Sequence, residues 1–334
     1  MLAVTGTDGK TTTTLLAVAM VEASGRRAVA AGNTEVPLVS ALDLDVDVFV
    51  VECTSFRLAF VDCFRPRAGT WLNFAPDHLD WHRSLDTYAT AKARIWEHQG
   101  PDDAAIGYAD DPVVTAWLAK APGRQLTFAP ARADYRVDRG RLVGPQGVFA
   151  EVADLRRRLP HDITNALAAA ATVLEGEVAT PAGIASALAT FEGVPHRISL
   201  VAQSGGMSFY DDSKATTPHA ALTAIRAFDR VVLVAGGRNK GLDLRAMAGA
   251  PERMRAVVAI GDAAPEVVAA FTSICPTVTA TSMDDAVARA TELAEPGDVV
   301  LLSPGCASFD WYGGYAERGD DFARAVRASL GARP

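Results

Sequence analysis

Thr5-Gly6-Thr7-Asp8-Gly9-Lys10-Thr11-Thr12 separates a short apolar strand, expected over Leu2–Val4, from a helix expected over Thr11–Ala23. Glycines let backbone N–H groups turn towards phosphate oxygens, and the following helix N-terminus adds its dipole. A lysine here supplies positive charge to the outer phosphates, and the next hydroxyl can ligate magnesium. The full G-x-x-x-x-G-K-[ST] pattern is not met, because its first glycine would fall on Val4, and a glycine turn that merely begins a helix is the alternative. The candidate nucleotide-binding residues are Gly6, Thr7, Asp8, Gly9, Lys10, Thr11 and Thr12.

Strands and helices alternate along most of the chain, which indicates an α/β fold with mostly parallel sheets. Strands are expected over 2–4, 47–51, 70–74, 230–235, 256–260 and 298–302, and helices over 11–23, 84–98 and 162–174. Two further strands, 198–201 and 207–210, flank Ser204-Gly205-Gly206 and are expected to form a hairpin. The expected domain boundary is Gly193–Arg197. We predict a P-loop domain over residues 1–193 and a smaller Rossmann-like α/β domain over residues 194–334.

Composition narrows the class of protein. The 334 residues carry a net charge of −8 with 49% apolar residues, which fits a globular chain and argues against broad nucleic-acid binding. The four cysteines form no CxxC pair, so we expect a reduced, cytoplasmic protein without structural zinc. No signal peptide and no 18-residue apolar run is visible, so membrane association is not expected. Only five basic residues are lysines: Lys10, Lys92, Lys120, Lys214 and Lys240.

Two features suggest a divalent-metal site. Glu52 closes the apolar strand that ends at Val51, and an acid at this position of a P-loop fold usually faces magnesium. Its alternative role is a helix cap or a solvated turn residue. One loop carries nitrogen and oxygen ligands that could bind a metal ion, although such surface clusters are common. Its members are Asp77, His78, Asp80 and His82.

Lys92 follows the apolar stripe of the helix expected over 84–98, in line with Leu85, Tyr88 and Ile95. Partial burial there would lower its pKa and leave more neutral amine. A neutral amine can react with carbon dioxide to give a carbamate, which is an anionic metal ligand. The alternative is a lysine whose stem lies on the core while its ammonium reaches solvent. The spacing alone favours neither.

Three loops in the second half follow apolar strands, which is where α/β folds bind ligands. In residues 211–216 (DDSKAT), Asp212 could bind a ribose hydroxyl and Lys214 a transferring phosphate; a helix cap with a surface lysine is the alternative. Residues 236–241 (GGRNKG) and 303–310 (SPGCASFD) are equally compatible with plain connecting loops. Cys306, in the last of these loops, lacks a histidine nearby in sequence and is not expected to be a nucleophile.

Together these segments resemble the Mur ligase superfamily of ATP-dependent amide-bond-forming enzymes, and most closely its glutamate-adding members. The resemblance follows the family's order along the whole chain. It is carried by Thr5–Thr14, Val51–Phe56, Asn73–His82, Tyr88–Trp96, His161–Ala171, Gly193–Arg197, Asp211–Thr216, Gly236–Gly241 and Leu301–Phe322.

The resemblance implies a ligase that adds glutamate to UDP-N-acetylmuramoyl-L-alanine through an acyl phosphate, using ATP, in peptidoglycan precursor synthesis. It implies two magnesium ions, one held by Thr11 and Glu52 and the other by His78 and carbamylated Lys92. The implied ATP-binding residues are Lys10, Asn165, Arg197, Asp212 and Lys214, with Lys214 near the transferring phosphate. Asn33 would touch the muramoyl substrate, and the glutamate pocket would be formed by Thr216, Lys240, Ser308 and Phe309.

The sequence departs from the family pattern in several places. Asp162 stands where an asparagine usually begins the adenine-side helix, residues 32–35 read GNTE where GNIG is usual, and Cys53-Thr54 replaces a serine-type pair. The resemblance also implies an N-terminal UDP-binding domain, which the sequence does not contain. Either the sequence is truncated, another chain supplies that domain, or the substrate differs.

Two other functions remain open. One is a ligase acting on a different carboxylate, as folylpolyglutamate synthases do, against which the SPGCASFD motif argues. The other is a nucleotide-binding subunit that needs a partner chain, against which the intact set of Lys10, Glu52, His78 and Lys92 argues.

Overall fold

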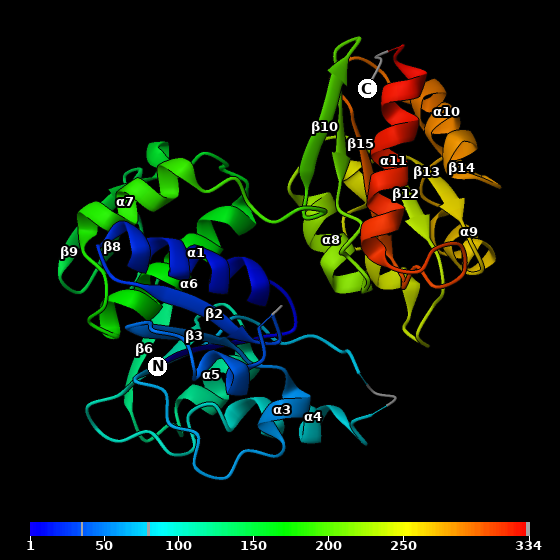
Figure 1. Cartoon of the computed structure of the whole chain (residues 1–334). Coiled ribbons are helices and arrows are strands. Elements are labelled where there is room, and N and C mark those ends of the chain that lie inside the picture. Colours follow the sequence, from blue (N-terminus) through cyan, green and yellow to red (C-terminus); the bar gives the residue numbers. More distant parts are fainter. Residues whose placement is uncertain (35, 79–80, 332–334) are drawn as a thin grey trace. The chain divides into compact units, whose positions relative to one another are not determined.

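The computed structural model describes residues 1–34, 36–78 and 81–331, and its internal contacts divide the chain into two compact units, residues 1–193 and 194–334. Each unit is built around one six-stranded sheet (Figure 1). The predicted α/β class with a largely parallel P-loop sheet is confirmed. In the described part of the chain, no helix is long and apolar enough to cross a membrane.

The first unit is a parallel sheet in the order β2-β3-β1-β4-β5-β6. Its strands are β1 (Leu2–Thr5), β2 (Ala28–Gly32), β3 (Val48–Glu52), β4 (Ala68–Trp71), β5 (Ala104–Tyr108) and β6 (Arg124–Phe128). The P-loop strand β1 is central and fully buried, because its residues Leu2–Thr5 are apolar or small. The loop after β1 therefore leaves the middle of the sheet at its carboxyl edge.

Helices cover both faces of this sheet (Figure 1). One face packs against α1 (Lys10–Ala23) and α6 (Pro160–Glu175), with the alanine-rich run of α6 allowing close approach, and α7 (Pro181–Thr190) packs on α1. The other face carries α3 (Ser55–Leu58), α4 (Leu85–Ala93) and α5 (Pro112–Leu118), while the short α2 (Leu38–Ala41) follows β2. An antiparallel three-stranded sheet, β7 (Arg136–Asp138), β8 (Arg141–Gly144) and β9 (Gly147–Glu151), leads to the 3-10 turn η1 (Val152–Asp154).

The second unit has the strand order β10-β11-β15-β12-β13-β14. The predicted hairpin is confirmed, because β10 (Ser199–Ser204) and β11 (Met207–Asp211) pair antiparallel. The remaining neighbours pair in parallel: β12 (Val231–Gly236), β13 (Met254–Ile260), β14 (Thr277–Thr279) and β15 (Val299–Gly305). The helices are α8 (Pro218–Arg226), α9 (Ala264–Phe271), α10 (Met283–Leu293) and α11 (Tyr315–Ser329), with 3-10 turns η2 (Leu244–Ala248) and η3 (Pro251–Arg253).

The helix predicted over 84–98 is wrong at its C-terminal end. Ser84 caps α4 as expected, but the helix ends at Ala93. The following residues form tight turns, in which the amide of Ile95 donates to Lys92 O and that of Trp96 donates to Ala93 O. The turns bury Ile95 and Trp96 under the sheet although they no longer belong to a helix.

Candidate active site

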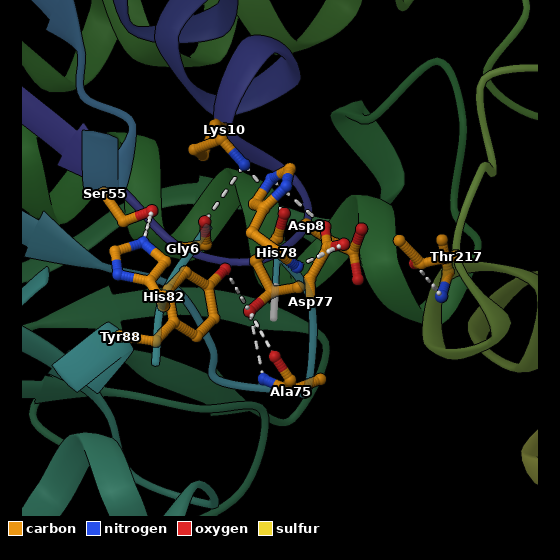
Figure 2. Close-up of polar contacts among 12 residues, drawn as sticks. Gly6, Asp8, Lys10, Ser55, Ala75, Asp77, His78, His82, Tyr88 and Thr217 are labelled. Atoms are coloured by element: carbon orange, nitrogen blue, oxygen red, sulfur yellow. Dashed lines mark hydrogen bonds and ion pairs between the residues drawn. The ribbon is translucent and has the colours of Figure 1, made fainter. Parts of the chain in front are cut away.

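The loop after β1 is held in place by Asn73, which follows β4. Its Oδ1 accepts hydrogen bonds from the backbone amides of Thr7 (3.0 Å) and Asp8 (2.9 Å), and its Nδ2 donates to Asp8 O (3.1 Å). The hydroxyl of Thr7 also meets Ala75 O (3.2 Å) and the Tyr88 hydroxyl (3.3 Å) (Figure 2). Sequence reasoning assigned Asn73 no role, although its place directly after the strand beside β1 was a usable signal.

At the helix end of the loop, Gly9 adopts φ = 82°, a left-handed conformation suited to glycine. A Cβ there would lie 2.9 Å from Asn165 Oδ1, so the side chain of Asn165 closes over the loop. The same oxygen is within 3.4 Å of Thr13 Oγ1. Asn165 therefore lies beside the first turn of α1, which also contains Thr11 and Thr12.

Two lysine amines converge on one carbonyl oxygen of this loop. Lys10 Nζ donates to Gly6 O (3.0 Å) and Thr7 O (2.7 Å), and Lys92 Nζ donates to Gly6 O (2.6 Å) (Figure 2 draws the Lys10 contact). Lys92 is 1% exposed, and its amine lies 4.6 Å from the centre of the Tyr88 ring. Burial, and then the charge of Lys10, hold the pKa of Lys92 well below its usual value.

The burial of Lys92 answers the question that its spacing left open, because its amine does not reach solvent. The apolar stripe on which that reasoning rested is only partly correct. Leu85 is 41% exposed, so the stripe does not extend to the start of α4. Lys92 is buried instead because the last turn of α4 passes under the loop after β1, at Gly6.

Glu52 ends β3 beside β1 and is 1% exposed. Its Oε1 accepts a hydrogen bond from Asn33 Nδ2 (3.0 Å), which comes from the end of β2. Its Oε2 is buried and has no hydrogen-bond partner among the described residues. A buried carboxylate oxygen without a donor is costly, so it fits a cation that the protein alone does not supply.

The loop after β4 does not gather its polar residues on one point. His78 adopts φ = 54°, and its Nε2 lies 3.3 Å from Asp77 Oδ2 (Figure 2). His82 is buried and binds Ser55 Oγ through Nε2 (2.9 Å), and Asp80 lies outside the described residues. Within residues 1–34, 36–78 and 81–331, no three His, Cys, Asp or Glu side chains gather as a metal site. The described residues of this loop therefore form no three-ligand group by themselves, and a role of His78 as a magnesium ligand stays a prediction.

Asp162, the residue that departs from the family pattern, lies in the first turn of α6. Its two oxygens accept hydrogen bonds from Arg157, Nε to Oδ2 (3.3 Å) and Nη2 to Oδ1 (3.1 Å), and Oδ2 also accepts from the Leu159 amide (3.2 Å). The carboxylate that replaces an amide here is thus neutralised by a local arginine.

In the second unit, the three predicted ligand loops follow β11, β12 and β15, which are neighbours in the sheet. Their carboxyl ends lie on one edge because these strands are parallel. The unit therefore brings the following predicted residues to that edge: Asp212, Lys214, Thr216, Lys240, Ser308 and Phe309.

The environments of these residues differ. Asp212 is buried, and its Oδ2 accepts a hydrogen bond from Ser303 Oγ (2.7 Å); burial raises the pKa of its carboxyl to about 7. Lys214 Nζ lies 5.1 Å from the centre of the Tyr315 ring. Ser308 is buried, whereas Phe309 is 63% exposed. Arg197 precedes β10 at the start of this unit.

Lys240 lies in a loop shaped by Asn239. The Nδ2 of Asn239 donates to Leu242 O (3.0 Å) and to Glu266 Oε2 (2.6 Å), and its Oδ1 accepts from the Leu242 amide (3.0 Å). These bonds close the loop around Lys240. Sequence reasoning did not single out Asn239.

A phosphate-type loop at the carboxyl edge of one parallel sheet, followed by a Rossmann-like unit with ligand loops at its own carboxyl edge, defines a two-domain nucleotide-binding α/β protein. Two protein-family models match these two units separately. The Mur ligase middle domain matches residues 4–173, and the Mur ligase glutamate ligase domain matches residues 196–306. The chain belongs to the Mur ligase family of ATP-dependent ligases, which confirms the predicted family.

The relatives extend this assignment along the chain. UDP-N-acetylmuramoylalanine–D-glutamate ligase of Frankia casuarinae is 45% identical over 99% of this chain and 72% of its own length. The enzyme of the same name from Thermobifida fusca is 39% identical over 99% of this chain and 76% of its own length.

Solved structures share the fold. The MurF ligase of Thermotoga maritima, solved in complex with ADP, superposes with a TM-score of 0.73 over 98% of this chain and 79% of its own, at 18% identity. FolC of E. coli, solved with DHPP and ADP, gives a TM-score of 0.69 over 98% of this chain and 88% of its own, at 16% identity. At these identities the likeness establishes the fold alone.

Proposed function

We propose that this protein is an ATP-dependent ligase that joins D-glutamate to UDP-N-acetylmuramoyl-L-alanine in peptidoglycan precursor synthesis. The observation that carries the proposal is the 45% identity over 99% of the chain to a ligase named for these two substrates. The folate-type alternative has no comparable support, because its structural relatives are 16–17% identical.

The proposed reaction has two steps. The carboxylate of the muramoyl-alanine substrate attacks the γ-phosphorus of ATP, which forms an acyl phosphate and releases ADP. The amine of glutamate then attacks the acyl carbon, inorganic phosphate leaves, and the amine loses a proton as the amide forms. The chain's contribution is to bring anionic groups together and to offset their charge.

In the first step, the N–H groups and the helix dipole at the start of α1 hold the phosphates, with Lys10 as a mobile positive charge. Lys10 binds two carbonyl oxygens of its own loop in this structure, and we propose that it exchanges them for phosphate oxygens. Asn73 holds the loop in place through the amides of Thr7 and Asp8. We propose that Asn165, which lies beside Gly9, contacts the nucleotide.

The residues present fit bound magnesium, as the unpartnered Oε2 of Glu52 indicates. We propose that Thr11 and Glu52 hold one ion and that His78 and carbamylated Lys92 hold a second. Magnesium, when bound, neutralises phosphate charge and so favours attack by the anionic carboxylate. Asn33 fixes Glu52 Oε1 and leaves its other oxygen available.

Lys92 suits carbamylation for two reasons. Its lowered pKa makes the neutral amine more abundant, and neutral amine is the form that reacts with carbon dioxide, losing one proton as the C–N bond forms. Its position at Gly6 O would set the resulting anion beside the phosphate loop. A carbamate there would also pair with the nearby charge of Lys10.

In the second step, the loops of the second unit supply the amino acid. We propose that Lys240 binds a carboxylate of glutamate and that Thr216, Ser308 and Phe309 shape its pocket. Arg197, Asp212 and Lys214 would contact the nucleotide and its phosphates. Each of these residues lies on a loop rather than inside a strand, which allows adjustment to the ligand.

The decisive test is ADP release with UDP-N-acetylmuramoyl-L-alanine, measured with D-glutamate and L-glutamate separately. We expect release that requires both the muramoyl substrate and D-glutamate. No release despite measurable ATP binding would overturn the proposal of a ligase that acts alone. Release with a reduced folate and L-glutamate instead would assign the chain to the folate-type reaction.

A further inference from the structure

The second unit contains a buried arginine that the proposed reaction does not use. Arg318 lies in the first turn of α11 and is 1% exposed, which places it among the largest fully buried side chains. It makes no ion pair among the described residues, so its charge is not neutralised by a carboxylate in contact. Burial lowers the pKa of its guanidinium to about 10. Burying a charge without an ion-pair partner lowers the stability of the folded state, so a residue of this kind suggests a functional role.

The guanidinium bonds only to oxygens of two loops. Its Nε donates to Ser213 Oγ (2.9 Å) and its Nη2 to Ser213 O (2.7 Å). Both Nη1 and Nη2 also donate to Cys306 O (3.2 Å each). These bonds tie the loop after β11 to the loop after β15 through one rigid, planar group.

A third loop packs against the same group. Gly237 adopts φ = 125°, and a Cβ there would lie 3.1 Å from Arg318 Nη1 and 2.3 Å from Ala307 O. Glycine at this position therefore allows the loop after β12 to rest against the guanidinium. Arg318 thus contacts or borders all three loops that carry the predicted ligand residues of this unit.

Each contact lies close to a predicted ligand residue in the chain. Ser213 stands between Asp212 and Lys214, Cys306 lies two residues before Ser308, and Gly237 lies three residues before Lys240. A shift at any one contact would move the neighbouring ligand side chain. The guanidinium fixes the spacing between these loops, because its N–H groups are held in one plane.

We propose that Arg318 is a positioning residue that sets the relative geometry of the three ligand loops and so prepares the glutamate and nucleotide contacts of the second unit. The identity of those ligands rests on the proposed function, whereas the bracing of the loops does not. Lysine cannot replace it, because a single ammonium cannot reach Ser213 Oγ, Ser213 O and Cys306 O in the same geometry.

Arg318→Met and Arg318→Lys, made in the full chain, test this role. The matched control is Arg324→Met on the same helix, because Arg324 is exposed and pairs with Asp284 and Asp321 rather than with a loop. Hydrogen exchange is measured without substrates over residues 212–216, 236–241 and 303–309. The Michaelis constants for glutamate and ATP are measured in parallel.

We expect exchange in all three loops to rise about tenfold or more in Arg318→Met, with a smaller rise in Arg318→Lys and none in the control. The Michaelis constant for glutamate should rise by a similar factor, and exchange in residues 1–34, 36–78 and 81–193 should not change. Should Arg318→Met fail to fold, Arg318→Lys decides alone, since it keeps the charge and loses the bonding geometry.

Two results would overturn the proposal. One is loop exchange and a glutamate Michaelis constant within twofold of the wild type in a folded Arg318 variant. The other is a rise in exchange spread evenly over residues 194–331, which would make Arg318 a contributor to general stability. Absence of glutamate-dependent ADP release in the wild type would instead contradict the proposed function and leave the exchange result valid.

Discussion

Replacing Glu52 by glutamine should change activity and stability in opposite directions. The substitution keeps the shape of the side chain and the oxygen that accepts from Asn33, but it removes the negative charge from the buried, unpartnered Oε2. Loss of an anionic contact to the phosphate-binding centre should lower kcat roughly 10²–10³-fold, a transition-state cost of about 2.7–4 kcal/mol by analogy with the loss of one electrostatic contact. Without ligands, relief of the unpartnered charge should raise the free energy of unfolding by about 1 kcal/mol.

Glu175→Gln is the matched control, because Glu175 is also buried in the same unit, at 4% exposed, but both of its carboxylate oxygens have hydrogen-bond partners. Its Oε2 accepts from Arg124 Nη2 (2.8 Å) and its Oε1 from the Tyr135 hydroxyl (2.6 Å). Here the amide weakens two charge-assisted bonds, so stability should fall by about 1–3 kcal/mol while activity is retained. The same chemical change thus gives opposite results at the two sites.

Thermal unfolding and ADP release measure both effects. A gain of about 1 kcal/mol corresponds to a rise in Tm of roughly 2–4 °C for a unit of this size. Saturating ATP and magnesium should stabilise the wild type by about 2.7 kcal/mol at one hundred times the Kd, and Glu52→Gln by less. The reasoning fails if Glu52→Gln is destabilised like Glu175→Gln, or if it turns over within a few-fold of the wild type.

Three further outcomes are expected. Lys92→Ala should lose at least about 10²-fold in turnover, whereas Lys120→Ala should lose none. Wild-type activity should fall when bicarbonate is removed. A Lys92→Ala variant that is fully active without added chloride or acetate would contradict carbamylation. Asn73→Ala should raise the Michaelis constant for ATP roughly tenfold, because it removes the hydrogen bonds that hold the loop after β1, worth about 1 kcal/mol or more. An unchanged Michaelis constant for ATP would contradict this role of Asn73. Burial raises the carboxyl pKa of Asp212 to about 7 in the folded state. The folded state therefore keeps a proton that the unfolded state loses above about pH 4. The free energy of unfolding should consequently fall as pH rises from about 4 to 7, by at most about 4 kcal/mol from this group. In urea titrations, the stability of Asp212→Asn relative to the wild type should therefore increase from pH 5 to pH 8, and a constant difference would disprove the shift.

The fold was predictable where periodicity and turn chemistry coincided. The phosphate loop between β1 and α1, and the hairpin of β10 and β11, are both marked by glycines between apolar runs. The antiparallel sheet of residues 136–151 was not predicted, because its short strands alternate only weakly between polar and apolar residues. The early end of α4 was missed for a different reason, since Ile95 and Trp96 keep the apolar spacing of a helix while lying in turns.

Only those site residues that lie in recognisable sequence motifs could be predicted. The sequence indicated Glu52 and Lys92 through strand ends and helix spacing, but it gave no account of Asn73 or Arg318. Both of these act by joining segments that are distant in the sequence: Asn73 reaches back 65 residues to Asp8, and Arg318 reaches back 105 residues to Ser213. Such contacts depend on which strands are neighbours in the sheet. The spacing of residues along one sequence does not predict that order.

The buried charged residues of the described part of this chain differ in whether an ion pair neutralises them. At or near the amino ends of strands, buried acids are paired with arginines. These pairs are Asp103 with Arg65, Glu175 with Arg124, and Asp298 with Arg255. Their charges are satisfied within the protein, so their role is structural.

At the carboxyl ends both kinds of buried charge occur, because Asp211 lies 2.6 Å from His196 Nδ1 whereas three other groups have no ion pair. Glu52, Lys92 and Arg318 are each 1% exposed, and none makes an ion pair among the described residues. Stability alone would favour pairing or replacing such groups. Unpaired buried charges at the edge where α/β proteins bind ligands suit an anionic, metal-bound substrate, because such a ligand would complete the electrostatics that the fold leaves open.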